Sequence, residues 1–137
     1  MQNKYIVDLS EVQLSDLELV GGKNASLGEM IQNLSKLGVN IPGGFALTIE
    51  AYWEFIHFNK LDKRIRSLIK KMKKDDLVSL RRTGLEIRQI IRNGEWPEDL
   101  KKEIKERYHL LSQNYGQDIT DVAVRSSATA EDLPDAS

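Results

Sequence analysis

Residues 20–30 read VGGKNASLGEM, a stretch that places two glycines and a lysine at the entrance of an amphipathic pattern. Gly21 and Gly22 make folding less favourable here, because glycine loses more backbone entropy on folding than any other residue. The first N–H groups of a helix have no partner within it and carry partial positive charge, which suits a phosphate. Two interpretations of Gly21, Gly22 and Lys23 follow: a phosphate-binding turn, or a tight turn that leaves the lysine solvated.

A helix is predicted after the glycine pair, because apolar residues recur there at helical spacing. Asn24 or Ser26 is expected to cap its N-terminus, Ser26 with Glu29 completing a capping box. Gly38 is expected to end it. One apolar face is expected from Leu27, Met30, Ile31, Leu34 and Leu37.

The segments on either side predict a small sheet. Residues 5–9 and 45–48 are short runs with β-branched or aromatic side chains, which are typical of strands. A third strand is expected over residues 122–124, ending at Arg125. Thr48 follows the second run and is expected to cap the next helix.

The middle of the chain predicts helices. From Leu61 to Tyr115 apolar residues form stripes at helical spacing, with a break at Trp96 and Pro97. We expect an antiparallel helical bundle inserted between the strands over about residues 49–115. The predicted fold class is therefore α+β, a small sheet that carries the motifs and a helical bundle insertion.

The composition excludes several classes of protein. The 137 residues are 40% hydrophobic and 30% charged, as in a soluble globular domain. The formal net charge of -1 argues against a general nucleic-acid binder. Without cysteine there is no disulfide or thiolate metal site. No apolar run approaches the ~20 residues that span a bilayer. We therefore expect a cytoplasmic protein with neither nucleic acid nor membrane as partner.

A second candidate motif, VRSSATAED, occupies residues 124–132. Arg125 stands at the expected strand end, a place from which its guanidinium group can donate two parallel hydrogen bonds to a phosphate. The alternative is a structural salt bridge from Arg125 to Glu131 or Asp132. Three hydroxyl residues follow the arginine: Ser126, Ser127 and Thr129.

Other charged or titratable residues carry no comparable signal. The basic run at residues 70–74 is followed at once by Asp75 and Asp76, which is typical of a solvated helix end. His57 and His109 lie in no serine–carboxylate arrangement and at no metal-ligand spacing. We therefore predict no catalytic residue and no metal ligand in this chain.

Together, three motifs resemble a known family. VGGKNASLGEM, GVNIPGGFALTIEAYWEFI (residues 38–56) and AVRSSATAEDLPDAS (residues 123–137) are similar to the N-terminal part of the phosphoenolpyruvate synthase and pyruvate, phosphate dikinase family. The resemblance implies that residues 1–137 are the first part of an ATP-grasp nucleotide-binding domain. It implies that Lys23 and Arg125 contact ATP phosphates, with Gly21 and Gly22 as weaker contributors.

The resemblance also implies a reaction for the whole protein: ATP, pyruvate and water give phosphoenolpyruvate, AMP and phosphate through a phosphohistidine. The swivelling domain that carries this histidine, the pyruvate-binding barrel and the Mg²⁺ ligands are expected downstream of Ser137. The 137 residues alone are therefore expected to be inactive. They would contribute positioning and charge neutralisation, the main sources of phosphoryl-transfer catalysis.

Other interpretations remain open. Pyruvate, phosphate dikinase itself and rifampin phosphotransferase carry the same module, and this chain has no acceptor site that separates them. Outside enzymes, both motifs could be structural turns of a helical interaction module. The occurrence of GGK and VRSS on either side of a long helical segment favours ATP binding. Convergence of Lys23 and Arg125 on one cleft is the observation that would separate the two classes.

Overall fold

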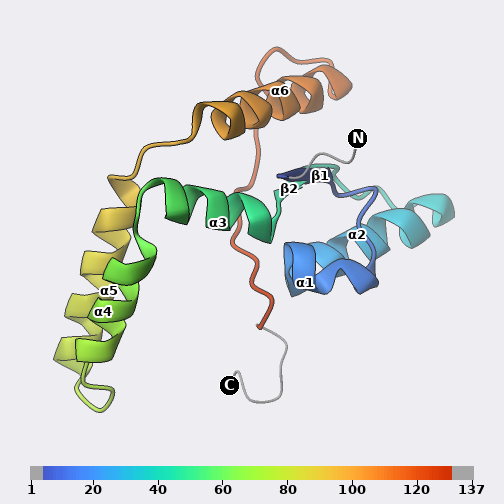
Figure 1. The fold of residues 1–137 in the computed structure, drawn as a ribbon. Coiled ribbons are helices and arrows are strands. Elements are labelled where there is room, and N and C mark those ends of the chain that lie inside the picture. The colour runs from blue at the N-terminus through green and yellow to red at the C-terminus, as the bar shows by residue number, and fades with distance from the viewer. Residues whose placement is uncertain (1–4, 131–137) are drawn as a thin grey trace. The chain divides into compact units, whose positions relative to one another are not determined.

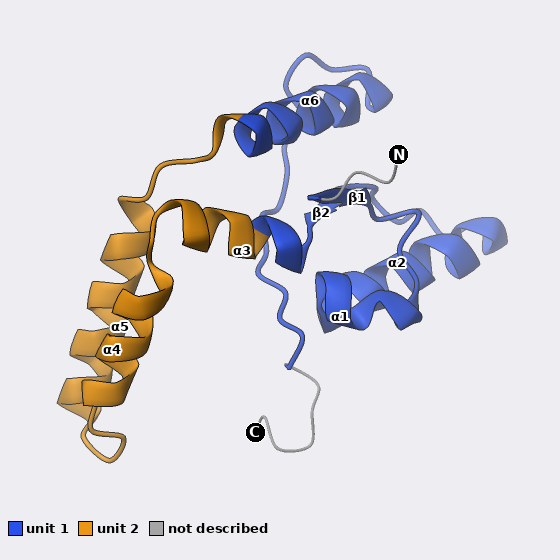
Figure 2. Cartoon of the chain, viewed as in Figure 1, with its two compact units in different colours: residues 1–51, 99–137 blue, residues 52–98 orange. Residues whose placement is uncertain are grey.

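The computed structural model describes residues 5–130, and these form an α+β arrangement of short strands and helices (Figure 1). This confirms the predicted fold class at the α+β level. The chain divides into two compact units, unit 1 with residues 1–51 and 99–137 and unit 2 with residues 52–98 (Figure 2). No helix within residues 5–130 is both long enough and apolar enough to cross a membrane.

The sheet of unit 1 consists, among the described residues, of β1 (Ile6–Asp8) and β2 (Phe45–Leu47). The two strands are antiparallel, with Val7 opposite Ala46. Both strands were predicted, and each is shorter than its apolar run. The Val7–Ala46 pair faces the unit 1 core, which also contains Leu9, Val12, Val20 and Ala25.

Two helices follow β1. After a 3₁₀ turn at Leu14–Asp16 come α1 (Leu17–Val20) and α2 (Gly22–Leu34). A second 3₁₀ turn at Ser35–Leu37 ends at Gly38, whose φ of 82° confirms it as the stop.

The buried face of α2 differs from the predicted one. Its buried residues are small, namely Gly22, Ala25 and Gly28. Leu27 and Ile31 pack against the core from the side, but Met30 and Leu37 are exposed. The reason lies at Gly28, where an added Cβ would lie 2.3 Å from the carbonyl oxygen of Val12. Helix and loop approach so closely there that a large side chain has no room.

Helices α3 (Ile49–Phe58), α4 (Asp62–Lys71), α5 (Leu77–Arg92) and α6 (Glu98–Asn114) follow β2. Thr48 caps α3 as predicted, with its Oγ1 accepting from the Ala51 N–H at 3.3 Å. The helices of the predicted insertion are divided between the two units, and the insertion itself stays a prediction. Residues 99–114 of α6 belong to unit 1, whereas α4 and α5 belong to unit 2.

Unit 2 has a core of its own, formed by Phe55, Ile56, Leu61 and Ile90, with Ile65 and Leu68 packed against it. Asn59 joins the end of α3 to the segment after α5. Its Nδ2 donates to the Glu95 carbonyl at 2.8 Å, and its Oδ1 accepts from the Glu95 N–H at 2.7 Å.

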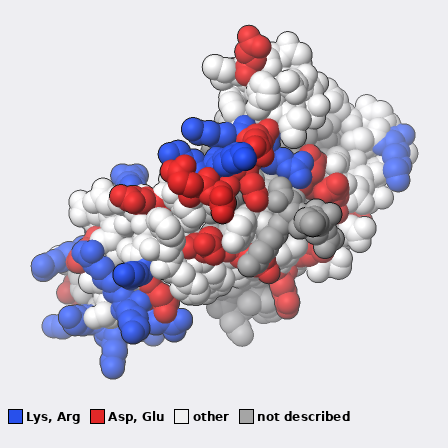
Figure 3. Space-filling view, turned by 45° about the horizontal axis from the view of Figure 1, so that its top comes forward, with Lys and Arg blue, Asp and Glu red and all other residues white. Residues whose placement is uncertain are grey.

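Basic residues gather over the α4–α5 end of unit 2 (Figure 3). The lysines of residues 70–74 are exposed, as expected of a solvated helix end. Asp76 then caps α5 by accepting from the Val78 N–H at 2.9 Å.

The predicted third strand is wrong. Residues 120–128 form no strand pair with any described segment, and Val124 is 93% exposed. Apolar, β-branched residues favour a strand, but a strand also needs a partner for its backbone groups. The start of this segment is held by α6 instead. The Tyr108 hydroxyl donates to the Thr120 carbonyl at 2.6 Å, and Ser112 Oγ accepts from the Thr120 N–H at 3.2 Å.

Candidate functional site

The first motif begins at Gly21, which links α1 to α2. Its backbone has φ 83° and ψ 161°, a conformation found almost only in glycine. Its N–H donates to the Leu17 carbonyl at 2.8 Å, which closes α1. An added Cβ would lie 2.3 Å from Ser127 Oγ and 2.9 Å from the Ala128 nitrogen. Gly21 is therefore required by both its backbone angles and the close approach of residues 127–128.

The start of α2 is capped by a segment distant in sequence. The Gly22 N–H donates to the Ala128 carbonyl at 3.1 Å. The backbone N–H of Asn24 donates to Ser127 Oγ at 3.4 Å, across 103 positions of sequence. These contacts satisfy donors that a helix start otherwise leaves without a partner.

The predicted local caps are wrong. Both Asn24 and Ser26 lie inside α2, which begins at Gly22. The side-chain amide of Asn24 instead donates to the Val20 carbonyl at 2.9 Å, at the end of α1. The local pattern failed because the donors of the first turn are satisfied from residues 127 and 128, which no window around residue 24 contains.

The backbone of the glycine pair is engaged with protein groups. The N–H groups of Gly21 and Gly22 donate to the carbonyl oxygens of Leu17 and Ala128. The missing side chain of Gly21 lets residues 127–128 lie directly against the start of α2. The weaker ligand role expected of the two glycines stays a prediction.

The two predicted phosphate contacts flank this junction. Lys23 follows Gly22 in the first turn of α2, and its side chain is exposed. Arg125 stands three residues before Ala128, in a segment that is neither helix nor strand, and is exposed as well. The Gly22–Ala128 hydrogen bond thus brings the backbones of the two motifs together, with a cationic residue of each within three positions of the contact. Glu131 and Asp132, the alternative partners of Arg125, lie outside the described residues.

Sequence reasoning missed two features that shape this region. Gly28 sets how closely α2 approaches the Val12 loop, and a glycine inside a helical pattern was the available signal. Tyr115, just after α6, anchors the loop before β2, since its hydroxyl accepts from the Gly43 N–H at 2.9 Å. That contact spans 72 positions and has no local signal.

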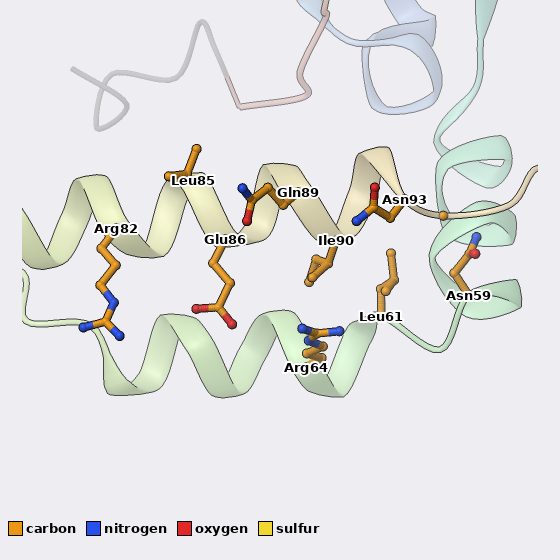
Figure 4. Close-up of a pocket in the computed structure, with 10 residues that line it drawn as sticks. Asn59, Leu61, Arg64, Arg82, Leu85, Glu86, Gln89, Ile90 and Asn93 are labelled. Carbon is orange, nitrogen blue, oxygen red and sulfur yellow. The ribbon is translucent and has the colours of Figure 1, made fainter.

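Unit 2 contains a pocket of about 600 Å³ that involves neither motif. Figure 4 shows Arg82 and Glu86 extending from α5 towards α4, whereas Arg64 of α4 lies further along, opposite Ile90. Nearby on α4, an exposed hydrogen bond and charge interaction with Asp62 raise the pKa of Arg66. The lining is mostly polar, with the buried side chains of Leu61 and Ile90 among it, and it carries no arrangement of nucleophile and base.

Residues 5–130 hold no group of three or more His, Asp or Glu side chains placed to bind a metal ion. His57 stacks on Trp53 with ring centroids 5.4 Å apart, and His109 interacts with Gln113 at 3.0 Å. Both histidines thus make ordinary contacts on their own helices.

Comparison with known proteins identifies relatives for nearly the whole chain. Residues 17–137 match the family model described as pyruvate phosphate dikinase, AMP/ATP-binding domain. The chain is 54% identical over 129 residues to the phosphoenolpyruvate synthase of Aquifex aeolicus, an alignment that covers 94% of this chain and 15% of the relative. It is 47% identical over 137 residues to the enzyme of Neisseria meningitidis, covering 100% of this chain and 17% of the relative. The enzyme of Escherichia coli is 44% identical over 128 residues, covering 93% and 16%. The chain thus spans about a sixth of the length of these relatives.

Proposed function

Because this chain belongs to the family of the pyruvate phosphate dikinase AMP/ATP-binding domain, we propose that unit 1 binds ATP phosphates through Lys23 and Arg125, near the point where Gly22 meets Ala128. The observation that carries the proposal is the Gly22–Ala128 hydrogen bond of 3.1 Å. It joins the backbones of two motifs that lie on either side of the helical segment. A pair of unrelated structural turns would not need to meet.

Lys23 and Arg125 supply the charge in this proposal. An ammonium group acts on phosphate as a compact charge, whereas a guanidinium group forms two parallel hydrogen bonds to it. Both side chains are exposed, so a triphosphate would reach them without unfolding a core. Gly21 contributes by letting the two segments approach each other, and Gly22 contributes through its N–H, which donates to the Ala128 carbonyl.

For the whole protein we propose the phosphoenolpyruvate synthase reaction, from ATP, pyruvate and water to phosphoenolpyruvate, AMP and phosphate. The curated relatives carry that name. In the proposal, an ATP-grasp domain begins with this chain, while a phosphohistidine domain and a pyruvate-binding barrel act as its partners in the cytoplasm. Mg²⁺ would be held by residues outside 5–130, which offer no cluster of ligands, and we assign it no step here.

The experiment measures ATP affinity of the intact protein that carries this chain, by titration calorimetry. Charged hydrogen bonds contribute about 1.5–3 kcal/mol, so Lys23→Ala or Arg125→Ala should weaken binding or lower kcat/KM by about 10- to 100-fold. The matched control is Lys36→Ala. Lys36 is also an exposed lysine of unit 1, and it lies about 20 Å along the helical rise from Lys23. Affinity and turnover equal to the Lys36→Ala control in both site variants would reject the proposed phosphate site.

A further inference from the structure

We propose that Ser127 is a positioning residue, which holds the segment that carries Arg125 against the start of α2 and so keeps Arg125 and Lys23 at one site. The inference rests on the proposed function, and it assigns to a neutral side chain a role that the motif's charged residues do not reveal.

The contacts of Ser127 single it out. Its Oγ accepts from the backbone N–H of Asn24 at 3.4 Å, and it occupies the space where Gly21 lacks a side chain. The next residue, Ala128, contacts the same helix start through its carbonyl, which accepts from the Gly22 N–H at 3.1 Å. Two consecutive residues, Ser127 and Ala128, thus accept hydrogen bonds from the first turn of α2. We call these two hydrogen bonds the Ser127–Ala128 contact.

The neighbouring residues do not share this position. Ser126 is exposed, whereas Ser127 is half-buried. The contact of Ala128 is made by its backbone carbonyl, so substituting the Ala128 side chain does not remove the group that makes it. Ser127→Ala therefore tests the Ser127–Ala128 contact, and Ser126→Ala is its matched control.

The Ser127–Ala128 contact affects the proposed phosphate site because it lies close in sequence to both charged residues. Lys23 lies one residue before Asn24, and Arg125 lies two residues before Ser127. A single hydrogen bond therefore restrains both backbones within two positions of their cationic side chains. Without it, the segment carrying Arg125 gains conformational freedom, which ATP binding would have to remove.

The experiment uses the intact protein and Mg²⁺-ATP as the probe. Dissociation constants are measured for wild type, Ser127→Ala and Ser126→Ala, each with and without Lys23→Ala, and Arg125→Ala is measured as a further single variant. In parallel, hydrogen exchange read by mass spectrometry follows the peptide covering residues 20–30 without nucleotide.

We expect Ser127→Ala to weaken ATP binding about three- to tenfold and Ser126→Ala less than twofold. Of the two serine variants, only Ser127→Ala should raise amide hydrogen exchange in residues 20–30. Lys23→Ala should cost less affinity in the Ser127→Ala background than in wild type, because the lysine has already lost its alignment with Arg125. A purely structural serine would leave the cost of Lys23→Ala unchanged.

Two different results would overturn the inference. If Ser127→Ala changes the ATP dissociation constant no more than Ser126→Ala, or if its effect simply adds to that of Lys23→Ala, Ser127 is not a positioning residue. The proposed phosphate site would then depend on Lys23 and Arg125 without help from Ser127. If wild type does not bind ATP, or if Lys23→Ala and Arg125→Ala both bind it normally, the proposed function falls and the role of Ser127 falls with it.

Discussion

Gly21→Ala tests the junction of the two motifs most directly. A non-glycine residue at φ 83° and ψ 161° costs about 1–3 kcal/mol in backbone strain. The new Cβ would lie 2.3 Å from Ser127 Oγ and 2.9 Å from the Ala128 nitrogen. Since a backbone atom cannot swing aside as a side-chain tip can, residues 127–128 must move. The Gly22–Ala128 hydrogen bond would then be lost, at a further cost of about 0.5–1.5 kcal/mol.

The expected total is about 2–4 kcal/mol in the local stability of the α1–α2 junction. Gly38→Ala is the matched control, because Gly38 has φ 82° but no atom within 4 Å of an added Cβ. It should cost only about 1 kcal/mol from the backbone, since Gly38 has the left-handed helical conformation with ψ 9°. The difference between the two variants therefore combines the contact with residues 127–128 and the greater backbone strain at Gly21.

Hydrogen exchange of peptides from α2 measures this difference, with peptides from α5 as an internal reference. Since 1.4 kcal/mol corresponds to a factor of ten, exchange in the first turn of α2 should rise about 30- to 700-fold in Gly21→Ala. Gly38→Ala should raise exchange about fivefold, near its own position. Equal effects of the two variants on the first turn of α2 would show that residues 127–128 do not lie against Gly21.

Two further predictions concern packing. Gly28→Ala should destabilise unit 1 by about 1–3 kcal/mol in urea unfolding followed by circular dichroism, because its methyl would be forced against the Val12 carbonyl. Gly84→Ala, whose Cβ would meet only a flexible arginine tip at 3.4 Å, should be neutral or stabilising, and an equal loss in both would refute the close approach at Gly28. Asn59→Ala removes both hydrogen bonds between the end of α3 and the segment after α5, so unit 2 should lose about 1–3 kcal/mol. Tryptophan fluorescence reports that unit, since both tryptophans lie in it, and an unchanged transition midpoint would contradict the prediction.

Features set by near neighbours could be predicted from the sequence. The Thr48 cap and the stop at Gly38 depend on residues within a few positions, and the structure confirms them. The apolar runs also predicted β1 and β2 correctly, although each strand needs the other, distant in sequence, as its partner. The motif residues were also recognised, since glycine beside lysine and serine after arginine are visible in the printed chain. Their ligand role stays a prediction.

Features set by distant residues could not be predicted in this way. Local rules placed the cap of α2 at Asn24 or Ser26, but Ser127 and Ala128 provide it across more than 100 positions. Local rules also placed a strand at residues 122–124, where the described chain offers no pairing partner. In both cases the outcome depends on which distant segments folding brings together, and a local window of sequence does not contain them.

The sequence by itself determined the α+β class, the helix start at Thr48, the stop at Gly38 and the two cationic motifs, because short-range sterics and hydrogen bonding operate between neighbours. The tertiary structure alone decided which residues lie against Gly21. Its left-handed backbone and missing side chain let residues 127–128 close onto the start of α2. The physical reason is that a buried N–H must find a partner, and here that partner comes from the far end of the described chain.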